Sequence, residues 1–167
     1  MIPLDLAERR SYSFPTQIRY GCGCVDELAE HIGSIREQLT KANFDCTLYT
    51  GVSVNPVKTD VDRGVDTFRE NRCDAIVGIG GGTSLDVARM IALMAHHQEF
   101  DLFHFEDGSG NEKDVRNEIP YFLTIPTTSG TGSEGGRSGV IIHPNTLEKK
   151  IIFAPQLMAR QVFVDPE

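Results

Sequence analysis

The most distinctive feature of the sequence is a run of three glycines, Gly80, Gly81 and Gly82, between an apolar stretch and a helical pattern. Glycines lack a Cβ atom and let the backbone approach a ligand closely, and the unpaired N–H groups of a helix start attract anions. This combination favours a site for the pyrophosphate of a dinucleotide. The alternative is a tight turn before a locally capped helix, because Thr83 and Asp86 have the spacing of a capping box.

A second run, PTTSGTGSE, is rich in hydroxyl groups and glycine and occupies residues 126–134, directly after another apolar stretch. Its side-chain oxygens and open backbone suit contacts to phosphate or ribose oxygens, and the alternative is a polar surface loop. Glu134 is a candidate acid or base, or equally a helix cap. Because both runs follow apolar strands, we expect them at the carboxyl edge of one sheet, where open α/β sheets bind ligands.

The segments that must position these runs alternate between helix and strand patterns. Apolar residues at helical spacing predict helices over residues 25–42, 57–71 and 85–97. Short apolar runs predict strands at 46–50, 74–79, 121–125 and 161–164, an edge strand at 14–21 and a β-hairpin from 139–142 and 150–153. Residues 106–118 read as a surface loop. Strands that alternate with helices predict an α/β domain with a mainly parallel sheet.

Composition narrows the class of protein. The length of 167 residues suits one domain, and 40% hydrophobic residues are enough for a core. The net charge of −8 argues against nucleic acid or an anionic membrane as the main partner. No run approaches the roughly 18 apolar residues of a membrane helix.

The cysteines and histidines do not predict a metal site. Cys22, Cys24, Cys46 and Cys73 have no zinc-site spacing and read as free thiols in a reducing cytoplasm. His96 and His97 are adjacent, so on a helix they point about 100° apart and cannot grip one ion as an i, i+4 pair would.

Four motifs together resemble the iron-containing (group III) alcohol dehydrogenase family. They are GGGTSLD at residues 80–86, PTTSGTGSE at 126–134, Val-Asn-Pro at 54–56 and Val-Asp-Pro-Glu at 164–167. Their order and spacing also match, and the similarity covers most of the chain. The resemblance implies a Rossmann-like parallel sheet with flanking helices that binds NAD or NADP. In this family a helical domain that binds divalent iron or zinc normally follows.

Carried over by position, the resemblance implies cofactor-binding roles for Asn55, Gly81, Gly82, Thr83, Ser84, Asp86, Thr127, Thr128, Thr131, Ser133 and Lys150. The stretch from Gly82 to Asp86 would hold the pyrophosphate, Thr127 and Thr128 the nicotinamide or its ribose, and Asn55 the adenosine half. Lys150, with Lys149 as the alternative, would match a lysine that the family carries after the hairpin. The implied reaction is hydride transfer between a primary alcohol or aldehyde and nicotinamide, aided by a metal that polarises the alcohol oxygen.

The sequence departs from the family pattern in three places. The family's metal ligands lie beyond the final Asp-Pro-Glu, so no residue here inherits that role and no catalytic residue is assigned. A strand and a helix that usually follow the first helix are missing near residues 31–36, which leaves the choice between NAD and NADP open. Gly135 and Gly136 replace the commoner Val-Thr.

We therefore expect residues 1–167 to form the cofactor domain of a longer, cytoplasmic, homo-oligomeric dehydrogenase, inactive alone. One alternative is a polyol dehydrogenase or dehydroquinate-synthase-like relative with the same glycine loop. The other is a non-catalytic nucleotide-binding or interaction module.

Overall fold

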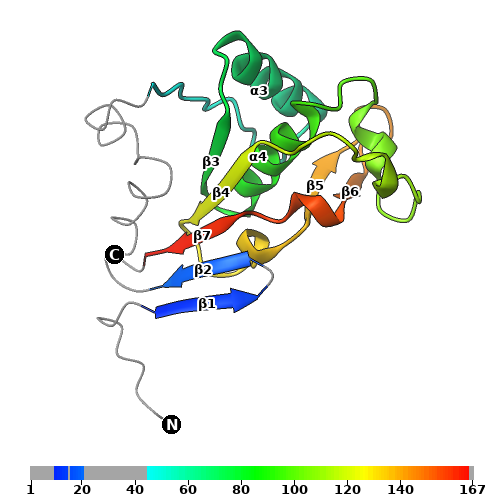
Figure 1. Cartoon of the computed structure of the whole chain (residues 1–167). Coiled ribbons are helices and arrows are strands. Elements are labelled where there is room, and N and C mark those ends of the chain that lie inside the picture. The colour runs from blue at the N-terminus through cyan, green and yellow to red at the C-terminus, as the bar shows by residue number, and fades with distance from the viewer. Residues whose placement is uncertain (1–9, 15, 21–44, 166–167) are drawn as a thin grey trace.

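The computed structural model describes residues 10–14, 16–20 and 45–165, and Figure 1 shows how its elements are arranged. One sheet contains β1 (Arg10–Phe14), β2 (Thr16–Tyr20), β3 (Ala75–Gly80), β4 (Tyr121–Pro126) and β7 (Gln161–Val164). A second, two-stranded sheet contains β5 (Ser138–Ile142) and β6 (Lys149–Phe153). The described α-helices are α3 (Lys58–Glu70) and α4 (Gly82–Met94). Short 3-10 turns are η2 (Leu102–Phe105), η3 (Glu112–Asp114), η4 (Ser133–Gly135) and η5 (Pro155–Leu157).

The larger sheet is mainly parallel, with the strand order β1-β2-β7-β4-β3. Strands β2, β7, β4 and β3 run parallel to one another, and β1 pairs antiparallel with β2. Along β3 and β4 the register pairs Ala75 with Tyr121 and Gly80 with Pro126, so the two strands end side by side. The loops that follow them therefore leave from the same edge of the sheet.

Helix α4 packs on one face of this sheet, with α3 and the β5-β6 hairpin beside it (Figure 1). Its Ala88 and Ala92 lie against Phe122 of β4 and Val162 of β7. Its other sides are buried too, where Met90 and Leu93 join a core with residues of α3, the hairpin and the 3-10 turns. Helix α4 is thus enclosed on nearly all sides, and its first turn is held at the carboxyl edge of the sheet.

Most of the expected elements are confirmed, and the α/β fold with a mainly parallel sheet is observed. The predicted helix at 57–71 is α3, the strand at 161–164 is β7, and the hairpin is β5 and β6. The 85–97 helix is α4, which runs from Gly82 to Met94 and so ends three residues earlier than predicted; beyond its end, the ring of His97 donates a hydrogen bond to the carbonyl of Leu93 (2.8 Å). The predicted helix at 25–42 lies outside the described residues.

One strand prediction is wrong, and a second is wrong in its position in the sheet. Residues 46–50 form no strand; Thr47, Leu48 and Tyr49 instead line a cavity of about 460 Å³ together with residues of β3. The segment bonds to α3 instead, where the hydroxyl of Tyr49 donates to the carbonyl of Asp60 (2.6 Å). The strand predicted at 14–21 is observed as β2, but it does not lie at the edge: β2 pairs with β1 on one side and with β7 on the other, and β1 forms the edge of the described sheet.

Candidate functional site

The first part of the site is the turn from β3 into α4. Gly80 has φ of +138°, a conformation that favours glycine, and a Cβ atom there would lie 2.7 Å from Oγ of Ser84. Gly81 is the N-cap of α4 and provides no side-chain cap, so within the described residues the first amide groups of the helix have no capping side chain. Amides and a positive dipole end of this kind are suited to receive an anion such as a phosphate group.

The capping-box alternative for this turn is wrong. The helix begins at Gly82, so Thr83 lies inside the first turn and cannot act as the N-cap. The carboxylate of Asp86 instead accepts hydrogen bonds from Ser133 and from the amide of Val140 (3.1 Å). The helix start is therefore free of a local acidic cap that would compete with a bound anion.

The second part of the site is the loop after β4, which begins with Thr127. The amide of Thr127 donates a hydrogen bond to the carbonyl of Gly80 (3.0 Å), which joins the ends of β3 and β4. A Cβ atom at Gly81 would lie 3.3 Å from Oγ1 of Thr128. At Gly82 it would lie 2.8 Å from Cγ2 of Thr131. The two loops predicted to share an edge of the sheet are thus in direct contact.

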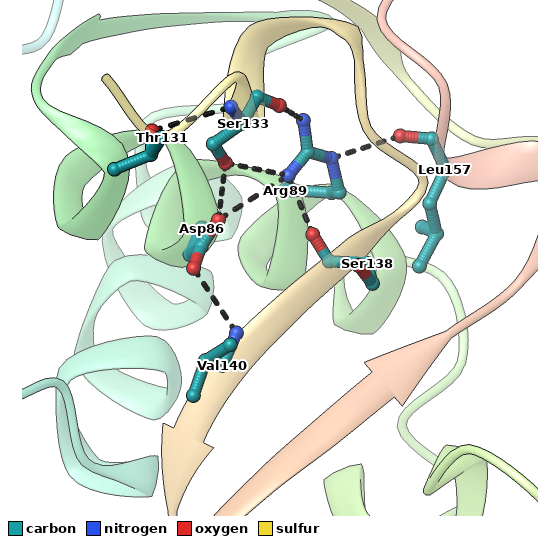
Figure 2. A network of polar contacts seen from close by, with 7 residues as sticks. All are labelled: Asp86, Arg89, Thr131, Ser133, Ser138, Val140 and Leu157. Atoms are coloured by element: carbon teal, nitrogen blue, oxygen red, sulfur yellow. Dashed lines mark hydrogen bonds and ion pairs between the residues drawn. The ribbon is translucent and has the colours of Figure 1, made fainter.

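Beneath this contact lies a network centred on Arg89 of α4, which is fully buried (Figure 2). Its guanidinium donates to the carbonyl oxygens of Leu157 (3.1 Å) and Ser138 (2.7 Å) and to both the carbonyl and the hydroxyl of Ser133. It also forms an ion pair with Asp86 (3.4 Å). One side chain of α4 therefore connects the helix to the second loop, to β5 and to η5.

Burial governs the electrostatics of this network. Desolvation lowers the pKa of Arg89, while the negative charges of Asp86 and Glu134 act in the opposite direction. A guanidinium remains protonated under all ordinary conditions, so the network contains a permanent buried positive charge. Such a charge needs hydrogen-bonding partners on every side, and the carbonyl groups around Arg89 supply them.

Two predicted site residues lie apart from this contact. Asn55 is exposed in the loop before α3, where the carbonyl of Pro56 accepts a hydrogen bond from Ile142 of β5 (2.8 Å). Lys150 of β6 forms ion pairs with Glu106 and Glu148, both at 3.1 Å, and these hydrogen bonds raise its pKa. In the part of the chain that the structure describes, the ion pairs of Lys150 are with these glutamates and not with the loops.

The remaining predicted residues are brought together. Gly81, Gly82, Thr83 and Ser84 form the start of α4, and Thr127, Thr128 and Thr131 lie in the facing loop. Asp86 and Ser133 form a hydrogen bond with each other, in which the Ser133 hydroxyl donates to the Asp86 carboxylate. Sequence reasoning missed Arg89, although one signal was present: it is the only charged residue in the apolar stretch from Val87 to Met94.

The described residues contain no group of three or more His, Cys, Asp and Glu side chains that could hold a metal ion. Among the same residues, no helix has both the length and the apolar character needed to cross a membrane.

Comparison with known proteins identifies clear relatives. A sequence model of the family described as "Iron-containing alcohol dehydrogenase" matches residues 27–166. Choline dehydrogenase of Bacillus subtilis is 28% identical over 94% of the chain and 44% of its own length. 1,3-Propanediol dehydrogenase of Citrobacter freundii is 35% identical over 78% of the chain and 30% of its own length.

A solved structure gives the same result. Sulfoacetaldehyde reductase from Bifidobacterium kashiwanohense, in complex with NAD+, aligns with a TM-score of 0.72 and 26% identity. The alignment covers 93% of this chain and 46% of that one. The chain thus spans less than half the length of the relatives it matches.

Proposed function

The chain belongs to the iron-containing alcohol dehydrogenase family, and we propose that it forms a domain that binds NAD or NADP. The bound cofactor would exchange a hydride with a small alcohol or aldehyde. The observation that carries the proposal is the contact between the two glycine loops at the carboxyl edge of β3 and β4. The packing of Thr131 against Gly82 places hydroxyl groups beside the free amides of α4.

The residues around this contact suit a dinucleotide. The amides from Gly82 to Ser84 would receive the pyrophosphate, because they point out of the positive end of α4. Thr127 and Thr128 are exposed in the facing loop and would hydrogen-bond to the nicotinamide or its ribose. The bound nicotinamide supplies the hydride acceptor or donor, and the protein contributes binding and orientation.

The other predicted contacts form part of the same proposal. Asn55, on the loop beside β5, would meet the adenosine half of the cofactor. Lys150 would contribute its positive charge, which its two glutamate partners preserve. NAD is the first candidate, because the reductase to which the chain is similar was solved with NAD+.

The described residues do not fit a metal ion, since they offer no ligand set. We therefore assign no step of the reaction to a metal in these residues. The proposal places hydride transfer in a full-length, cytoplasmic, homo-oligomeric enzyme of which residues 1–167 form the nucleotide-binding domain.

Calorimetric titration of the 167-residue chain with NADH and with NADPH tests the proposal. We expect saturable binding of at least one nucleotide, without turnover of 1,3-propanediol by this chain. Absence of binding at millimolar concentrations of both nucleotides would contradict the cofactor role. Turnover of 1,3-propanediol by this chain alone would contradict the proposal that it only binds the nucleotide and needs another domain for the reaction.

A further inference from the structure

Asp86 and Ser133 were both predicted to contact the cofactor, but their side chains bind each other and Arg89. The carboxylate of Asp86 is occupied by Ser133 on one oxygen and by the amide of Val140 on the other. A carboxylate is also a poor neighbour for a pyrophosphate, because the two negative charges repel each other. A direct contact between Asp86 and the phosphates is therefore chemically unfavourable.

The network holds Ser133 at several atoms. Its carbonyl accepts from Arg89, and its hydroxyl accepts from Arg89 (3.3 Å) and donates to Asp86. The amide of Ser133 donates to Oγ1 of Thr131 (3.2 Å). The chain of contacts thus runs from the second turn of α4 through Ser133 to Thr131 (Figure 2). Thr131 in turn lies against Gly82 in the first turn.

These hydrogen bonds fix the loop after β4 relative to the start of α4. Without them, the exposed stretch from Thr128 to Gly132 would have few constraints: Cβ atoms at Gly130 and Gly132 would meet nothing within 4 Å. A buried ion pair is weak evidence for stability, because apolar residues of similar volume often serve as well. The definite consequence of Arg89 is geometric, since its planar fork fixes partners in defined directions.

We propose that Asp86 and Arg89 are positioning residues, which hold Ser133 and thereby keep the loop at residues 128–132 against the first turn of α4, in the arrangement that receives a dinucleotide. This inference rests on the proposed function for its effect on nucleotide affinity. The positioning of the loop itself stands on the hydrogen bonds and can be measured without nucleotide.

The test compares Ser133→Ala, Asp86→Asn, the double variant and the matched control Ser109→Ala. Ser109 also bridges two polar groups, the carbonyl of His104 (3.2 Å) and the amide of Asn111 (3.2 Å), in a different loop. Arg89→Lys, which keeps the charge and loses the fork, serves as a second variant if Asp86→Asn does not fold.

The first readout is hydrogen exchange of residues 127–136 without nucleotide. The amides of Ser133, Gly135 and Gly136 are hydrogen-bonded there, so their protection is measurable. We expect exchange at least about tenfold faster in Ser133→Ala and Asp86→Asn, and unchanged exchange in Ser109→Ala. Unchanged exchange in both network variants would overturn the proposal.

The second readout is the Kd for NADH. Each network variant should bind at least about fivefold more weakly, and the double variant no more weakly than the weaker-binding single variant, because both act through one contact. Additive losses would overturn the proposal, since independent contacts to the nucleotide add. If the wild-type chain binds no nucleotide, the proposed function fails while hydrogen exchange still decides the positioning role.

Discussion

A Cβ atom on Gly82 would lie 2.8 Å from Cγ2, 2.9 Å from Oγ1 and 3.1 Å from Cβ of Thr131. The first turn of α4 and the loop after β4 are therefore packed together without room for one further carbon atom. This contact joins the two glycine-rich runs, which are separated by about forty residues in the sequence, into one structural feature. It gives Gly82 a role in packing, apart from any contact with a ligand.

Gly82→Ala should push Thr131 away and disturb the site. We expect a loss of about 1–3 kcal/mol in the free energy of unfolding, as for other overpacked positions, together with weaker NADH binding. Adding Thr131→Ala should recover part of the lost free energy of unfolding, because it removes the two atoms closest to the new carbon. It should not restore NADH binding, because it also removes the Oγ1 that accepts the hydrogen bond of Ser133. Gly135→Ala is the control, since a Cβ atom there meets nothing within 4 Å. Equal effects at Gly82 and Gly135 in chemical denaturation would contradict the packing argument.

Gly80→Ala should be destabilising for a different reason. The φ of +138° is strained for any residue with a Cβ atom, and the new carbon would also meet Ser84. The expected loss is about 1–3 kcal/mol. Gly130→Ala, in open space and without a positive φ, should change the free energy of unfolding by less than about 0.5 kcal/mol. Urea unfolding of both variants measures the difference.

Thr83→Asp should separate stability from nucleotide affinity. An acidic side chain in the first turn of a helix stabilises it by about 0.3–1 kcal/mol, but at α4 it would repel the pyrophosphate. We expect thermal stability to hold or rise while NADH affinity falls about tenfold, equivalent to about 1.4 kcal/mol. Thr59→Asp places the same charge at the same helical position of α3 and should leave NADH affinity unchanged. Equal affinity in the two variants would exclude the start of α4 as the phosphate site.

Asp114 should contribute to the acid sensitivity of the fold. A hydrogen bond from His104 (2.9 Å), aided by Arg116, lowers the pKa of its carboxyl group. Because the folded-state pKa lies below the unfolded value of about 3.9, the contribution is present above that pH and lost as the pH falls through the folded-state pKa.

Asp114→Asn should therefore flatten the decline in stability below about pH 4, measured as the urea midpoint at a series of acidic pH values. The exposed Asp66 on α3 supplies the control variant Asp66→Asn. Superimposable acid profiles for the wild type and Asp114→Asn would rule out the hydrogen bond as a source of this sensitivity.

The parts of the fold that depend on local pattern could be predicted from the sequence. The apolar runs of β3 and β4, the helical spacing of α3 and the turn between β5 and β6 each contain their own signal. The adjacency of the glycine loops also followed, because parallel strands end at the same edge of a sheet. These are consequences of chain periodicity and of a general rule about sheets.

Features that depend on distant partners could not be predicted. Residues 46–50 have strand-like composition, yet Thr47, Leu48 and Tyr49 border a cavity beside β3, which nothing local in the sequence reveals. The spacing of Thr83 and Asp86 matched a capping box, yet the carboxylate of Asp86 accepts hydrogen bonds from Ser133 and Val140, which lie far along the sequence. Arg89 in an apolar helix signals a buried partner without saying which one. In each case, residues distant in the sequence determine the local conformation or the side-chain contact.

The most direct test of the nucleotide site at the start of α4 is NMR of the isotopically labelled 167-residue chain during titration with NADH. We expect the largest amide shifts at Gly81–Ser84 and at residues 127–131, the two loops in contact at the start of α4. Shifts confined to α3 or to the β5-β6 hairpin, or no shifts at millimolar NADH, would contradict it.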